Sequence, residues 1–95
     1  VARNWRAGRY EIDIVARKID MIHLVEVKTR KAGSLISPEA SITPAKASAM
    51  RRAARAYVGQ SRVMDEVSID LVAVDMFPDG SHHIRFIAEA VEFGW

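Results

Sequence analysis

Two short apolar runs of this chain carry charged residues where a buried strand would be uniformly apolar. Asp13 interrupts residues 12–16, and Glu26 and Lys28 interrupt residues 24–28. Residues two apart on a strand project from the same face of a sheet, so Glu26 and Lys28 are predicted to share one face. Burying a charged group without a partner costs several kcal/mol. The fold is therefore expected to bring these charges together or to leave them open to solvent.

A hairpin between the two runs predicts which charged residues face one another. A turn centred between residues 19 and 20 places Asp13 opposite Glu26 and Glu11 opposite Lys28, with all four side chains on one face. A turn centred one residue earlier keeps them on that face but shifts the pairs. An odd-numbered turn without a bulge would separate them onto two faces.

The remaining patterns predict a mixed α/β fold with the element order β-β-α-β-β. The four predicted strands cover residues 10–17, 21–29, 67–76 and 83–92. A loop is expected over residues 30–42, which contain Gly, Pro and Ser. Thr43 and Pro44 predict a helix start, and the helix is expected to reach about Val58 and to end at Gly59.

Composition excludes several classes of protein. The chain is 49% hydrophobic and 27% charged, and it has no apolar run long enough to span a membrane, so no membrane partner is expected. It has no cysteine, which excludes disulfides and thiol catalysis and fits a cytoplasmic location. Because no linker or repeat divides the chain, residues 1–95 are expected to form one domain. The abrupt start predicts a further segment upstream.

The carboxylates and the lysine are the parts of a divalent-metal hydrolytic site. Asp13 and Glu26 repel one another unless a cation lies between them. Mg²⁺, or Mn²⁺ in its place, suits one or two carboxylates with water and a substrate phosphate, and the Val27 carbonyl is a further candidate ligand. Lys28 would orient or deprotonate the attacking water, or stabilise charge on the phosphate. From spacing alone, the alternative is an exposed sheet face with ordinary ion pairs.

Positive charge is concentrated in the middle of the chain. Eight lysines and arginines lie between residues 28 and 62 against Glu39 alone, although the net charge is only +2. Such a patch suits the phosphates of a nucleic-acid backbone, and a solvated helix face is the alternative. The expected nucleic-acid contacts are Arg30, Lys31, Lys46, Arg51, Arg52 and Arg55.

Lys46 has an unusual position on the predicted helix. Helical spacing places Ser48, Arg51, Arg52 and Arg55 on one arc, whereas Lys46 falls on the packing side in the first turn. A cation there opposes the helix dipole unless a carboxylate cluster or a phosphate lies nearby. Lys46 is therefore predicted to be an accessory site residue. The alternative is a lysine that only extends along apolar surface to reach water.

Three other features are expected to be structural. Asp70 interrupts an otherwise apolar run and is predicted to cap or pair with another group. Trp5 and Tyr10 are predicted to pack under the sheet rather than to stack on bases. His82 and His83 point to opposite faces of a strand, so they are not expected to chelate one metal ion.

Four ordered motifs resemble the YraN-like family of uncharacterised bacterial proteins. They are Arg3-Asn4-Trp5-Arg6, Glu11-Ile12-Asp13-Ile14-Val15-Ala16, Val25-Glu26-Val27-Lys28-Thr29-Arg30 and Thr43-Pro44-Ala45-Lys46. The resemblance continues through residues 69–74 and covers nearly the whole chain. That family is similar to the PD-(D/E)xK nucleases, notably the archaeal Holliday junction resolvases. The resemblance implies a restriction-endonuclease-like fold, with an N-terminal helix upstream of this sequence.

The resemblance also implies roles for individual residues. Asp13 and Glu26 would bind the metal, Lys28 would be the catalytic lysine, and Glu11 matches an acidic accessory position. Tyr10 stands where members usually have Gly, which puts access to the site in question. The implied function is a metal-dependent endonuclease acting on DNA, branched or structured DNA included, with a homodimer as one expected assembly. The alternatives are a nucleic-acid-binding module that cleaves nothing and a structural interaction domain.

Overall fold

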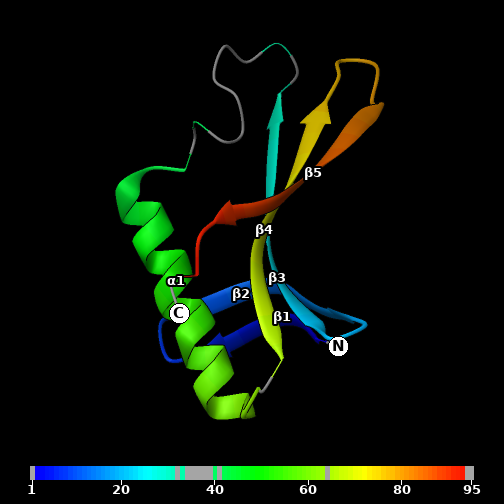
Figure 1. Cartoon of the computed structure of the whole chain (residues 1–95). Helices are drawn as coiled ribbons and strands as arrows, with labels where there is room; N and C mark the ends of the chain where they lie inside the picture. Colours follow the sequence, from blue (N-terminus) through cyan, green and yellow to red (C-terminus); the bar gives the residue numbers. More distant parts are fainter. Residues whose placement is uncertain (1, 32, 34–39, 41, 64, 94–95) are drawn as a thin grey trace.

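A mixed five-stranded sheet with one helix against it forms the fold (Figure 1). The computed structural model describes residues 2–31, 33, 40, 42–63 and 65–93. In chain order the elements are β1 (Ala2–Ala7), β2 (Tyr10–Lys18), β3 (Met21–Lys31), α1 (Pro44–Ser61), β4 (Glu66–Met76) and β5 (His82–Val91). The strands lie in the order β1-β2-β3-β4-β5, with β3 and β4 parallel and the other neighbours antiparallel. This α/β arrangement is compatible with the predicted restriction-endonuclease-like fold.

β1 is a strand that the sequence did not predict. It pairs with β2 through a two-residue turn at Gly8 and Arg9, so that Ala7 faces Tyr10. Gly8 has a φ of +59°, which glycine adopts without strain and which the first position of a type II′ hairpin turn requires. Because β1 is an edge strand, its polar side chains are exposed, and no apolar alternation marks it.

The hairpin of β2 and β3 has the predicted turn and register. Residues 19–20 form the turn, and the paired residues run from Lys18 and Met21 to Ile14 and Val25. The turn is therefore the even-numbered one that the carboxylate arrangement required. β3 continues further than predicted, because its long parallel ladder with β4 extends to Lys31. The rest of the predicted loop falls largely outside the described residues.

The helix begins as predicted and ends later. Thr43 is the N-cap, and its side chain accepts a hydrogen bond from the Lys46 N–H at 3.1 Å. The predicted end at Gly59 is wrong, because α1 continues to Ser61 and closes at Arg62. Arg62 has a left-handed φ of +52°, and its N–H donates to the Val58 carbonyl. Glycine inside a helix costs only about 1 kcal/mol, and the left-handed cap at Arg62 closes the helix beyond it.

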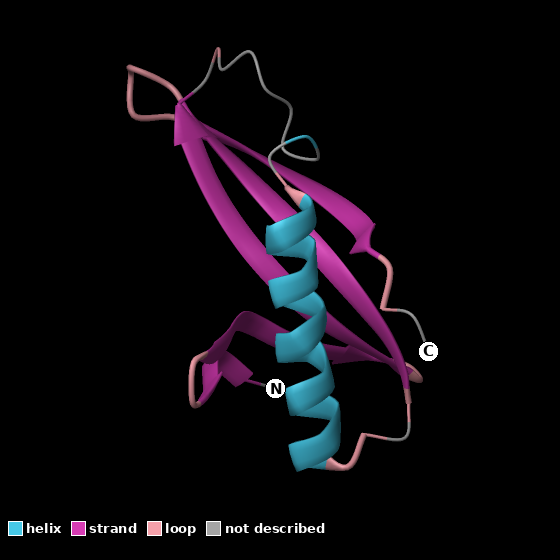
Figure 2. Ribbon diagram, turned by 90° about the vertical axis from the view of Figure 1, so that its left-hand side faces the viewer, coloured by secondary structure: helices cyan, strands magenta, loops and turns pink. Residues whose placement is uncertain are grey.

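The core lies between α1 and the sheet face that the helix covers (Figure 2). The buried helix residues are Met50, Ala53, Ala54 and Tyr57, which belong to the predicted packing arc. They pack against strand residues Ile12, Val15, Ile22, Leu24, Val67 and Ile69. The Trp5 ring meets Tyr57 edge to face with centroids 5.2 Å apart, and Tyr10 packs against the same core, so the packing prediction for these aromatics is confirmed. Among the described residues, no helix is both long enough and apolar enough to cross a membrane.

Candidate metal and phosphate site

The Asp13 side chain bridges β2 and β3 where their backbone pairing stops. Within residues 2–31, which are all described, the β2–β3 pairing ends at Ile14 and Val25. One residue further on, Asp13 Oδ2 accepts a hydrogen bond from the Val27 N–H at 2.8 Å. The carboxylate therefore takes the place of a backbone acceptor. Its other oxygen, Oδ1, has no hydrogen-bond partner within the described part of the chain.

The Val27 backbone faces the same gap between the strands. The N–H and C=O groups of one strand residue point to the same side of the strand. Because the Val27 N–H meets Asp13, the Val27 carbonyl lies on the β2 side as well. The Asp13 carboxylate and the Val27 carbonyl thus both face the point where the ladder opens.

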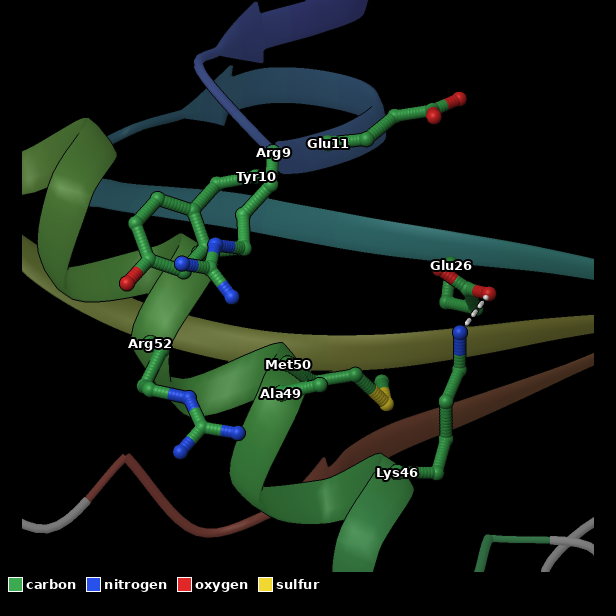
Figure 3. A pocket seen from close by; sticks show the side chains of 9 residues that line it. Arg9, Tyr10, Glu11, Glu26, Lys46, Ala49, Met50 and Arg52 are labelled. Carbon is green, nitrogen blue, oxygen red and sulfur yellow. Dashed lines mark ion pairs between the residues drawn. The ribbon is translucent and has the colours of Figure 1, made fainter.

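Glu26 projects from β3 toward the first turn of α1. Its Oε1 lies 2.8 Å from Lys46 Nζ, with side chains that are 22% and 42% exposed (Figure 3). This ion pair offsets the unfavourable interaction of Lys46 with the positive end of the helix dipole. The structure thus places Lys46, the predicted accessory residue, beside a predicted site carboxylate.

Glu11 and Lys28 do not form the pair that the extended hairpin register predicted. Glu11 faces Arg6 across the β1–β2 ladder, with 3.7 Å between Arg6 Nη2 and Glu11 Oε1. Pairing with β3 has already stopped at this level, so β1 rather than β3 provides the partner. Lys28 is exposed, two residues beyond Glu26, and forms no ion pair with any described residue.

A cavity of about 440 Å³ opens between the β1–β2 turn, β3 and α1 (Figure 3). Its charged and aromatic walls are Arg9, Tyr10, Glu11, Glu26, Lys46 and Arg52, and its apolar wall is Ala49, Met50 and Ala53. Four predicted site or nucleic-acid residues therefore meet at one cavity, from two strands and the helix. Arg9 was missed from the sequence, because its position depends on the unpredicted β1–β2 turn.

The residues predicted to contact nucleic acid differ in solvent exposure and in whether they form ion pairs. Arg52 and Arg55 are exposed on α1, Arg51 is half-buried, and Lys31 is exposed at the end of β3. These four are open to solvent to different degrees, and among the described residues no ion pair engages them. Their contact with nucleic acid stays a prediction.

Arg30 instead belongs to an ion-pair cluster that crosses from β3 through β4 to β5. Its Nε donates to Asp75 Oδ1 at 2.7 Å, and Arg85 Nη2 lies 3.3 Å from Asp75 Oδ2. The hydrogen bond from Arg30, with the charges of Arg30 and Arg85, holds the pKa of Asp75 below its usual range. Arg30 is therefore engaged in stabilising the pairing of β3 with β4.

Asp70 forms a second polar cluster, in the interior of the sheet. Its wholly buried carboxylate accepts hydrogen bonds from His23 Nδ1 at 2.7 Å, Ser68 Oγ at 2.5 Å and the Glu89 N–H at 2.9 Å. These bonds lie where the register of β4 and β5 shifts, and Glu89 has a positive φ of +51°. The prediction that Asp70 pairs is confirmed, and its partners come from three strands.

The donor set fits Mg²⁺ or Mn²⁺ in chemical type. Asp13 and Glu26 supply carboxylate oxygens and Val27 supplies a carbonyl, and each carboxylate keeps one oxygen without a partner among the described residues. No group of three or more His, Cys, Asp or Glu side chains suited to a metal gathers in the described ranges. Mg²⁺ commonly keeps several waters and shares a substrate phosphate, so few protein ligands suffice.

Comparison with known proteins places the chain in a family. The family model described as uncharacterised protein family UPF0102 matches residues 1–74. A UPF0102 protein of Streptomyces coelicolor is 47% identical over 92 residues, 90% of this chain and 71% of its own length. One from Sorangium cellulosum is 38% identical over 94 residues, 95% of this chain and 65% of its own length.

A UPF0102 protein of Oleidesulfovibrio alaskensis is 45% identical over 75 residues, 78% of this chain but only 37% of that protein. The chain thus spans between 37% and 71% of the length of these three relatives. On the family match and these identities, the chain belongs to the UPF0102 family, the YraN-like family that its motifs resemble.

Proposed function

We propose that this chain is a metal-dependent endonuclease that hydrolyses DNA phosphodiester bonds in the cytoplasm, with branched or structured DNA as its substrate. The observation that carries the proposal is the position of Asp13. Its carboxylate spans the opening between β2 and β3 and accepts from the N–H of Val27, the residue that follows Glu26 in the chain. A sheet that served only packing would continue its backbone ladder here, because unpaired backbone groups are costly.

Each residue of the opening has a role in this proposal. Asp13, Glu26 and the Val27 carbonyl would hold Mg²⁺ or Mn²⁺, which supplies Lewis-acid polarisation of the phosphate and an activated water. Lys28 is exposed on the same strand as Glu26, where its ammonium can orient the water or stabilise developing charge. Lys46 pairs with the Glu26 carboxylate at 2.8 Å, and the bound ion would compete with it for that carboxylate.

The cationic face of α1 would bind the DNA substrate of the proposed site. Arg51, Arg52 and Arg55 extend from the helix whose first turn carries Lys46. Cations on this face neutralise phosphates and release counterions, so affinity for DNA is expected to fall as salt rises. The helix thus supplies sequence-independent binding beside the carboxylates.

A calorimetric titration of the protein with Mg²⁺ and with Mn²⁺ tests the site. Asp13→Asn is the matched variant, because asparagine keeps the size and an oxygen that can accept from the Val27 N–H. Wild type is expected to bind the ion, and the variant to lose most of its affinity for the ion. The circular dichroism spectrum of the variant is expected to match that of wild type. Absence of binding to wild type would remove the enzyme proposal.

A nucleic-acid-binding module without cleavage is the second candidate. The ion pair of Lys46 with Glu26 favours it, because a lysine already neutralises this carboxylate without a metal. In that case wild type would bind DNA and cleave none, and Arg51→Ala with Arg55→Ala would lower the affinity.

A further inference from the structure

We propose that the cavity between the β1–β2 turn and α1 binds one unpaired nucleotide, with its phosphate held by Arg9 and Arg52. Both arginines line the cavity, Arg9 from the turn and Arg52 from the helix (Figure 3). This inference rests on the proposed function for the class of ligand, and it names the part of the substrate that the site recognises.

The charges of the cavity favour a phosphate. Three cations and two acids line it: Arg9, Lys46, Arg52, Glu11 and Glu26. Glu11 has its own cation in Arg6 at 3.7 Å, and Glu26 has Lys46 at 2.8 Å. Arg9 and Arg52 are exposed, and neither forms an ion pair with any described residue. Two uncompensated guanidinium groups remain, and the planar fork of arginine matches phosphate oxygens.

The size of the cavity selects a single nucleotide rather than a duplex. Its volume of about 440 Å³ lies within the range of small-ligand pockets, roughly 300–1,000 Å³. A double helix, whose major groove alone is about 12 Å wide, does not enter a space of this kind. The nucleotide must therefore be unpaired, as at a frayed end, a flap or a junction.

The uncharged walls suit a sugar and a base. Tyr10 presents an aromatic side chain, and Met50 and Ala53 add apolar surface from the helix. Tyr10 also packs against the hydrophobic core, so the sugar and base would contact this wall through apolar surface, with no requirement for sequence. Glu26 lines the same cavity, so a nucleotide bound there lies beside one of the proposed metal ligands. The cavity would thereby position an unpaired nucleotide beside the bond to be cut.

Binding of thymidine 5′-monophosphate in EDTA, measured by calorimetry, tests this proposal. Arg9→Gln and Arg52→Gln are each expected to weaken binding about tenfold, because each removes a charge-assisted hydrogen bond to the phosphate. Arg3→Gln is the matched control, since Arg3 is exposed on β1 and does not line the cavity. Thymidine without the phosphate is expected to bind much more weakly than the monophosphate.

Three results would overturn the proposal: no binding of the monophosphate, full binding in both cavity variants, or an equal loss in Arg3→Gln. Circular dichroism of each variant verifies the fold, and Arg52→Gln lies on an exposed helix position where glutamine is well tolerated. EDTA removes metal and no cleavage is measured. Failure of the nucleotide to bind would therefore refute only the nucleotide site and not the endonuclease proposal. Conversely, a protein that binds the nucleotide but not Mg²⁺ would refute only the endonuclease proposal.

Discussion

Removal of the Asp70 carboxylate is expected to destabilise the fold by about 3 kcal/mol. The side chain is wholly buried and accepts from His23, Ser68 and the Glu89 N–H. Asp70→Ala leaves these donors without their acceptor, and a buried unsatisfied donor costs roughly 1–3 kcal/mol. The His23 side chain is 23% exposed, so water can partly replace its partner. The main cost therefore comes from Ser68 and the Glu89 backbone.

Urea unfolding followed by tryptophan fluorescence measures this change in the free energy of unfolding. Asp20→Ala is the matched control, because Asp20 is exposed in the β2–β3 turn and its substitution is expected to cost less than about 0.5 kcal/mol. In the His23→Ala background, Asp70→Ala should cost less than in wild type, since one donor is already gone. A loss below about 1 kcal/mol for Asp70→Ala, equal to that of the control, would refute the reasoning.

Three further predictions concern the site, the pH dependence and the first turn. Lys46→Met should strengthen Mg²⁺ binding by up to about fivefold in calorimetry, because an exposed ion pair of about 0.2–1 kcal/mol no longer competes for Glu26; weaker binding would contradict this. The pKa of Asp75 is lower in the folded chain than its ordinary 3.8, so its interaction with Arg30 stabilises the fold above that pH and is lost as pH falls through the folded value. Stability should therefore fall less steeply below pH 3.8 in Asp75→Asn than in wild type, and parallel acid-unfolding curves would argue against the pair. Gly8→Ala should cost about 1–2 kcal/mol because alanine disfavours a φ of +59°, and an unchanged urea midpoint would show that the turn relaxes.

The features that could be predicted from the sequence are those set by local patterns. The even-numbered turn at residues 19–20 and the helix start at Thr43 depend on neighbouring residues, and the structure has both. The phase of the helix also placed Lys46 on the side where Glu26 is found. The end of α1 was not predicted, because Arg62 rather than Gly59 adopts the left-handed conformation that caps the helix.

The details of the site depend on features that the alternation of apolar and polar residues along a strand does not reveal. β1 lacks a regular alternation of exposed and buried residues, and only Gly8 signalled its turn, so Arg9 and the Arg6 partner of Glu11 were both missed. Asp13 was expected above the sheet face, whereas it lies in the gap between the strands and accepts from the Val27 N–H. The separation of two strands is a tertiary property, and a period of two along each strand does not reveal it.

Cleavage of labelled DNA is the most direct test of the proposed site. Linear, flapped and four-way DNA would be incubated with wild type and with Asp13→Asn, in Mg²⁺ or Mn²⁺ and in EDTA. Wild type is predicted to cut branched DNA only with the metal, and Asp13→Asn to be slower by about a hundredfold or more, as when one transition-state contact is lost. No cleavage of any substrate by wild type, or equal rates for the two proteins, would contradict an endonuclease built on Asp13.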